Sequence, residues 1–159
     1  MSYTSKSPGS FLRSIATTHL LMVTGQLLFG LFACARSGWV YFGLRSSNDE
    51  VIFAVPLLAF CAIIADHVLF KQQLRVLRNK NTLSERLSGY HGAMMIRFAL
   101  LGIPSIFAII AYMFNKNVFF MGVATPMILY FTLLRPTKEK VENDLHIDFN
   151  ARAQAQRVK

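Results

Sequence analysis

The sequence predicts an all-α integral membrane protein with four transmembrane helices arranged as antiparallel hairpins. Three observations predict this class. The 159 residues are 53% hydrophobic and only 16% charged, with a mean hydropathy of +0.40, which is too apolar for a soluble domain of this size. The apolar residues gather in four runs near the roughly 20 residues that a helix needs to cross a bilayer. The basic residues lie mostly on one side of these runs. We therefore expect residues 1–159 to form a single transmembrane domain in contact with the lipid bilayer.

The first predicted span covers residues 15–35 and follows a polar opening that carries Lys6 and Arg13. A basic start, an apolar run and small residues around Cys34 also resemble a secretory signal peptide. The apolar run is longer than the roughly 7 to 15 residues of a signal core. We expect a retained transmembrane helix, with cleavage as the alternative.

The second and third predicted spans, 51–70 and 93–114, are joined by a segment whose leucines recur with helical spacing while the charges lie between them. Thr82 and Glu85 have the spacing of a capping box, which marks the start of a helix. The two spans should therefore form one long hairpin that projects beyond the bilayer over residues 71–92. This projection is either a docking surface for a partner or a solvated hairpin end.

The fourth predicted span, 118–134, follows the third after so few residues that the two must be antiparallel neighbours. In the cytoplasmic tail, residues 135–159, Pro136 should end the span. Thr137 can then cap a short helix that reaches about His146.

Two further features concern these helices. Val141 and Leu145 fall on one face of the short tail helix, which should lie at the membrane interface or against the projecting hairpin. Pro104 and Pro126 lie inside their spans and are expected to kink them.

The distribution of basic residues predicts the orientation. They alternate with the spans instead of forming one stripe, which argues against nucleic acid as the partner. One side carries Lys6, Arg13, Lys71, Arg75, Arg78, Lys80, Arg86, Arg135, Lys138, Lys140, Arg152, Arg157 and Lys159. The other side carries Arg36, Arg45 and Lys116. By the positive-inside rule, both termini should face the cytoplasm.

Small residues form a seam along each helix of the predicted hairpin. These seams include Ala59, Ala62, Ala108 and Ala111. Small side chains let helices approach closely in lipid, where van der Waals packing drives association. We expect a membrane-protein partner or a homo-oligomer to use these seams or the 71–92 projection.

Asp66 and Arg97 are predicted to form a structural ion pair within the hairpin. If the turn is centred near Lys80, Arg97 lies about one helical turn deeper than Asp66. An arginine at that depth extends toward its own interface, which carries the guanidinium toward the carboxylate. A bidentate pair would satisfy both groups.

Three other polar side chains, His19, Gln26 and His67, could form a polar cluster in the spans, with a histidine as a third member of the ion pair. Gln26 lies deeper and is expected to make an interhelical hydrogen bond. Cys34 and Cys61 lie at depths about 14 Å apart, so no disulfide can join them. We expect no metal site.

The segment "YHGAMMIRFALLGIPSIFAIIAYMF", with the tail "RPTKEKVENDL", resembles a group of uncharacterised small bacterial inner-membrane proteins with four spans. The resemblance implies a multi-pass protein of the cell inner membrane. The hairpin is also similar to the c subunit of rotary ATP synthases, whose ring helices carry a carboxylate for the moving ion. This chain has Gly102 where that pattern needs the carboxylate, which weakens any inference of ion translocation.

The sequence contains no nucleophile elbow, phosphate-binding glycine loop or HExxH motif. We therefore expect a non-enzymatic integral subunit or assembly factor of a bacterial inner-membrane complex, without a cofactor. The alternative is a small transporter or proton-conducting oligomer that uses Asp66 and His67. A third class is a membrane-bound enzyme or a haem protein with His19 and His67 as ligands.

Overall fold

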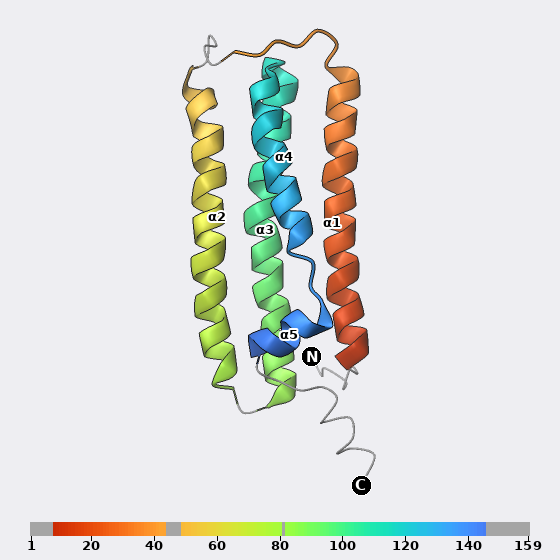
Figure 1. The fold of residues 1–159 in the computed structure, drawn as a ribbon, viewed down its shortest axis with the longest axis vertical. Helices are drawn as coiled ribbons and strands as arrows, with labels where there is room; N and C mark the ends of the chain where they lie inside the picture. The colour runs from red at the N-terminus through yellow and green to blue at the C-terminus, as the bar shows by residue number, and fades with distance from the viewer. Residues whose placement is uncertain (1–7, 44–48, 81, 146–159) are drawn as a thin grey trace.

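The computed structural model describes residues 8–43, 49–80 and 82–145, and this part of the chain is helical apart from its connections (Figure 1). Its helices are α1 (Pro8–Arg36), α2 (Asp49–Arg78), α3 (Leu83–Asn115), α4 (Val118–Leu133) and α5 (Lys138–Leu145). Three of them contain segments long and apolar enough to cross a membrane: Phe11–Arg36, Glu50–Arg78 and Ser84–Asn115. The protein is thus a multi-pass membrane protein by the length and composition of its helices.

The fourth predicted span is shorter than the other three. α4 has 16 residues and is about 24 Å long, against roughly 30 Å of bilayer hydrocarbon. It counts as a span only together with α5, from which it is bent by 79°. The bend falls at Pro136, which cannot continue a helix. α3 and α4 continue through Pro104 and Pro126 without a break, so the sharp change of direction lies at neither of these prolines.

α3 is the central helix, with α1 on one side and α2 on the other (Figure 1). α4 packs along one face of α3 and touches both flanking helices. α1 and α3 run in one direction and α2 and α4 in the other. The start of α1, the turn between α2 and α3, and α5 therefore lie at the same end of the bundle.

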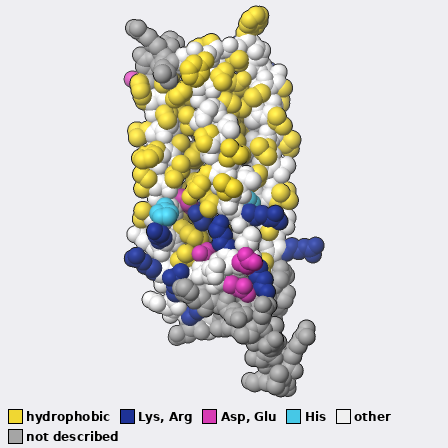
Figure 2. All heavy atoms as spheres, viewed as in Figure 1, with side chains coloured by type: hydrophobic (Ala, Val, Ile, Leu, Met, Phe, Trp, Pro, Cys, Tyr) yellow, Lys and Arg dark blue, Asp and Glu magenta, His cyan; other side chains and the backbone are white. Residues whose placement is uncertain are grey.

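The polar end and the apolar body of the molecule are separate on its surface. Figure 2 shows apolar side chains over most of the visible face, and basic, acidic and histidine side chains below them, toward the end that holds α5. Large apolar side chains on α1 and α2 are exposed, such as Leu21, Leu31, Phe53 and Phe60. Exposed apolar helix faces are expected where lipid is the solvent.

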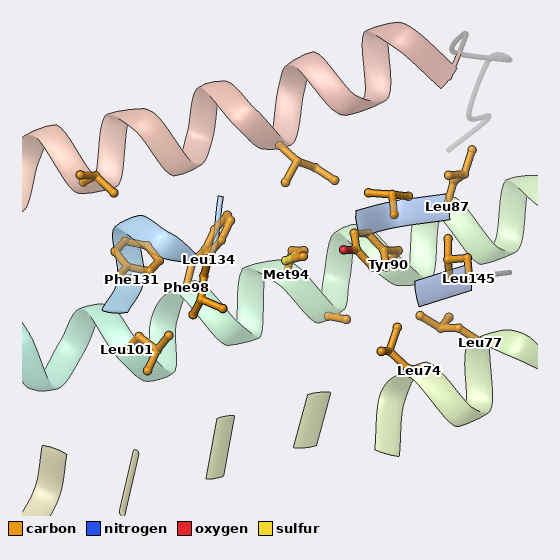
Figure 3. Close-up of a cluster of buried hydrophobic side chains, with 14 of the residues drawn as sticks. Leu74, Leu77, Leu87, Tyr90, Met94, Phe98, Leu101, Phe131, Leu134 and Leu145 are labelled. Atoms are coloured by element: carbon orange, nitrogen blue, oxygen red, sulfur yellow. The ribbon is translucent and has the colours of Figure 1, made fainter. Parts of the chain in front are cut away.

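The core at the polar end is built from α2, α3 and α5. Leu74, Leu77, Leu87 and Leu145 gather around Tyr90 (Figure 3). α5 buries Val141 and Leu145 completely, as their common face predicts. Additional hydrogen bonds hold α5 in place: Tyr90 donates to Asp144 Oδ2 at 3.1 Å, and Arg78 Nε donates to the Asp144 carbonyl at 2.9 Å. The inner side of the 71–92 projection is therefore covered by the protein's own tail helix.

The opposite end is closed by a buried asparagine. Asn117 is completely buried, and its side-chain oxygen accepts from the Phe119 N–H as the N-cap of α4. Its amide nitrogen donates to the Gly43 carbonyl at 2.6 Å. Tyr41 adds two backbone hydrogen bonds with the same turn, at 3.1 Å and 3.0 Å. Asn117 thus joins the α1–α2 connection to the α3–α4 turn.

The helix starts follow the predicted capping signals. Thr82 accepts from the Glu85 N–H at 3.3 Å as the N-cap of α3. Thr137 accepts from the Lys140 N–H at 3.3 Å at the start of α5. α5 is described to Leu145, so the predicted end at His146 lies outside the described residues.

The small-residue seams do not form an external surface. Ala59, Ala62, Ala108 and Ala111 are all buried within the chain. Ala59, Ala108 and Ala111 pack in the cores between the helices, whereas Ala62 lines a groove between α2 and α3. Most of the seam is therefore used within the chain, and its use by a partner stays a prediction.

Candidate functional site

The side chains of Asp66 on α2 and Arg97 on α3 meet between the two helices. Arg97 Nε lies 3.0 Å from Asp66 Oδ1 and donates to Oδ2 at 3.1 Å. Both residues are buried, with exposed fractions of 1% for Asp66 and 8% for Arg97. The predicted partners are therefore in contact, but through Nε facing both oxygens and not through the two-nitrogen fork of a bidentate pair.

An aromatic ring completes this arrangement. The guanidinium carbon of Arg97 lies 4.3 Å from the centre of the Phe70 ring, which is the distance of a cation–π contact. Phe70 comes from α2, one helical turn after Asp66, and faces α3 in the same way. Arg97 is thus held by an anion and a ring from the same neighbouring helix, which leaves its charge compensated inside the bundle.

His19 has a different partner from the one predicted. It is buried, and its Nε2 lies 2.9 Å from the Phe131 carbonyl oxygen. The ring also packs against Phe98 and Phe131, with centroids 5.2 Å and 5.0 Å away. Phe131 lies in the last turn of α4, where its carbonyl oxygen also accepts from the Leu134 N–H at 3.2 Å. His19 therefore joins α1 to the end of α4 instead of joining the ion pair.

His67 is separated from His19 and Gln26. It is exposed on α2, whereas His19 and Gln26 are buried on α1, on the other side of α3. The structure does not bring the three side chains into one polar cluster. This arrangement also keeps the two histidines from ligating one haem, because α3 lies between their helices.

Gln26 is buried between α1 and α3, with 3% of its surface exposed. Its Oε1 has no hydrogen-bond partner among the residues that the structure describes. Its Nε2 lies against Gly102, where an added Cβ would come within 3.1 Å of the nitrogen. The predicted interhelical hydrogen bond is therefore not made within the described part of the chain. Asp66 Oδ1 and Gln73 Oε1 also accept no hydrogen bond within the described residues, but Asp66 is ion-paired with Arg97, and Gln73 lies near the end of α2.

Two apolar grooves run along the side of α3 that α4 does not cover. The groove between α1 and α3 has a volume of about 550 Å³ and includes Gln26 and Gly102. The groove between α2 and α3 has a volume of about 480 Å³ and includes Cys61 and Ala62. Ala99 and Ile103 line both grooves and form the ridge between them.

Neither groove is lined by Asp66, His67 or Arg97. Within the described ranges, no group of three His, Cys, Asp or Glu side chains is placed to hold a metal ion. The described residues thus place an ion pair between α2 and α3, and a buried amide beside the apolar groove between α1 and α3.

Two polar residues that hold the structure together escaped prediction. Asn117 precedes a helix, and asparagine at that position is a capping signal, but its bond to Gly43 depends on a distant loop. Tyr90 reaches Asp144 across 54 positions of sequence, for which no local pattern exists. Comparison with protein-family models, curated proteins and solved structures found no match for this chain.

Proposed function

We propose that this protein is a non-enzymatic integral subunit or assembly factor of a bacterial inner-membrane complex. One observation carries the proposal: Asp66, Arg97 and His19, which are buried in the helix core, have partners within the chain, while the uncovered side of α3 is apolar and grooved. Asp66 forms an ion pair with Arg97, and His19 forms a hydrogen bond with the Phe131 carbonyl. What remains open to another molecule is a surface suited to packing against a membrane helix.

Purification in a mild detergent followed by native mass spectrometry tests this role. We expect a complex of defined mass that contains at least one other membrane protein. Recovery of this chain only in assemblies of its own copies, at several detergent concentrations and expression levels, would contradict the subunit role.

The rival function is a proton-conducting oligomer. It is favoured by the position of Asp66, since an ionisable residue in a spanning helix is by default a functional candidate. His67 is its exposed neighbour and would connect the carboxylate to the surface. A proton flux in proteoliposomes that disappears in Asp66→Asn would replace the subunit role with this one.

The proposed orientation has both termini in the cytoplasm. It is supported by the basic residues of α2 and α3 near their connecting turn, which include Arg75, Arg78 and Arg86, and by the positive-inside rule. Reporter fusions test it. We expect a fusion at Lys116 to be active only as an extracytoplasmic reporter, and an active cytoplasmic reporter there would reverse the orientation.

A further inference from the structure

The groove between α1 and α3 combines small residues with a buried polar group. On both helices its lining residues recur with the three- and four-residue spacing of one helix face. They are Met22, Gly25, Gln26 and Phe29 on α1, and Phe98, Ala99, Gly102, Ile103 and Ile106 on α3. An added Cβ at Gly25 would meet nothing within 4 Å, so this position leaves room for another backbone to approach.

Gln26 supplies the observation that points to a specific occupant. It is 97% buried, and its Oε1 has no partner among the described residues. Gln26 lies about 16 Å along α1 from the start of the predicted span, near the middle of a roughly 30 Å hydrocarbon layer. No water is available there, and an unpaired amide in hydrocarbon costs free energy.

A lipid acyl chain would fill the groove without relieving this cost, because it has no hydrogen-bond donor or acceptor at that depth. The occupant must bring a polar group to the middle of the membrane. A primary amide both donates and accepts hydrogen bonds, so another primary amide can accept from its nitrogen and donate to its oxygen at the same time. Rotation about the last side-chain bond exchanges the oxygen and nitrogen, so either atom can face the groove.

We propose that a second copy of this chain occupies the groove and that the Gln26 amides of the two copies bond to each other. Two copies inserted in the same direction have Gln26 at equal depth. A two-fold axis along the membrane normal, passing through the groove, brings the same residue from each copy together. Gly25 is exposed and has open space where a side chain would begin, so the partner helix can approach closely enough for the pair to form. The dimer goes beyond the proposed function, since it needs no other protein.

The test measures proximity in membranes with single cysteines. In a background of Cys34→Ala and Cys61→Ala, Gly25→Cys places a thiol in the groove. Leu27→Cys is the matched control, because Leu27 is exposed at nearly the same depth on another face of α1. We expect oxidation to cross-link Gly25→Cys into a species of twice the chain mass, with at least a fivefold larger yield than Leu27→Cys.

The amide is tested separately by energy transfer between labelled chains in lipid vesicles. Gln26→Leu should weaken self-association on the order of tenfold, since two hydrogen bonds are lost in lipid. Thr24→Val, which alters an exposed polar residue on another face of α1, should leave it unchanged.

Three results would overturn the dimer: equal cross-linking at positions 25 and 27, unchanged association of Gln26→Leu, or cross-linking of Gly25→Cys to a protein of another mass. The last result would leave the subunit role intact. Recovery of the dimer without any other protein would instead support the dimer and contradict the subunit role. The two proposals therefore fail separately.

Discussion

The two flanks of α3 hold their buried polar side chains in different ways. On the α2 flank, Asp66 meets Arg97 at 3.0 Å and the two charges compensate each other, although Asp66 Oδ1 accepts no hydrogen bond within the described residues. On the α1 flank, Gln26 is equally buried, but its Oε1 has no partner among the described residues. The first interface pairs its buried charged side chains with each other, whereas the second leaves its buried amide without a partner among the described residues.

This difference shows which observation carries information in a membrane protein. An exposed apolar side chain such as Ile103, at 64% exposed, signals little, because lipid solvates it. A buried polar atom without a partner is informative, because neither lipid nor an apolar neighbour can satisfy it. Gln26, a buried side chain with no partner among the described residues, therefore indicates a partner surface better than the largest apolar patch does.

The largest loss of stability should come from breaking the ion pair between α2 and α3. Arg97→Ala and Asp66→Ala each leave an uncompensated charge among helices, and each should cost roughly 3 to 5 kcal/mol of folding free energy. Yield in membranes and unfolding of the purified protein by a denaturing detergent measure the loss.

The neutral double variant, Asp66→Ala with Arg97→Ala, provides the control. It should recover part of the lost stability, because no unpaired charge remains. A double variant as unstable as the sum of the single ones would show that each residue acts alone. A harmless Arg97→Ala, together with an activity abolished by Asp66→Ala, would favour the transport function.

A second, smaller loss of stability is expected at the other end of the bundle. Asn117→Ala removes the α4 cap and the bond to the Gly43 carbonyl, and should destabilise the protein by about 2 kcal/mol. Unfolding under the same conditions measures it. Asn115→Ala is the matched control, because Asn115 is less buried and bonds only within its own helix in the described chain, to the Ala111 carbonyl.

A smaller effect is expected at His19. His19→Phe keeps an aromatic ring between Phe98 and Phe131 but removes the hydrogen bond to the Phe131 carbonyl. The loss should be about 1 kcal/mol, the net value of one such bond. His67→Phe, at an exposed position, should change stability by less than half as much. Equal losses from the two variants would mean that the carbonyl bond contributes nothing.

The apolar runs and their order were predictable because bilayer thickness imposes a length on each helix. The predicted spans 15–35, 51–70 and 93–114 lie inside α1, α2 and α3, which extend beyond them. The depth of Arg97 relative to Asp66 follows from counting residues around a tight turn, and this local geometry is why their contact could be anticipated.

The remaining contacts depend on how separate hairpins pack. Which face of α3 receives α4 is not encoded in any short pattern, so the bond between His19 and Phe131 and the isolation of His67 could not be foreseen. The same reasoning explains Gln26. Its polarity within an apolar run was visible, but the absence of a partner appears only once α1 is placed beside Gly102.

The smallest change in monomer stability should come from a substitution of Gln26, on the α1 flank of α3. In Gln26→Leu, a side chain of similar size replaces a buried amide whose Oε1 makes no hydrogen bond within the described residues, so the monomer loses little on that account. Leucine also removes the cost of placing the amide among apolar neighbours. We expect the unfolding free energy of the monomer to fall by no more than about 0.5 kcal/mol, or to rise. It is measured in detergent at a protein concentration too low for association. The same variant should weaken association in vesicles, so stability and association respond in different directions. A loss of 2 kcal/mol or more in the monomer would show that Gln26 is satisfied inside its own chain, and the contrast between the two flanks of α3 would then disappear.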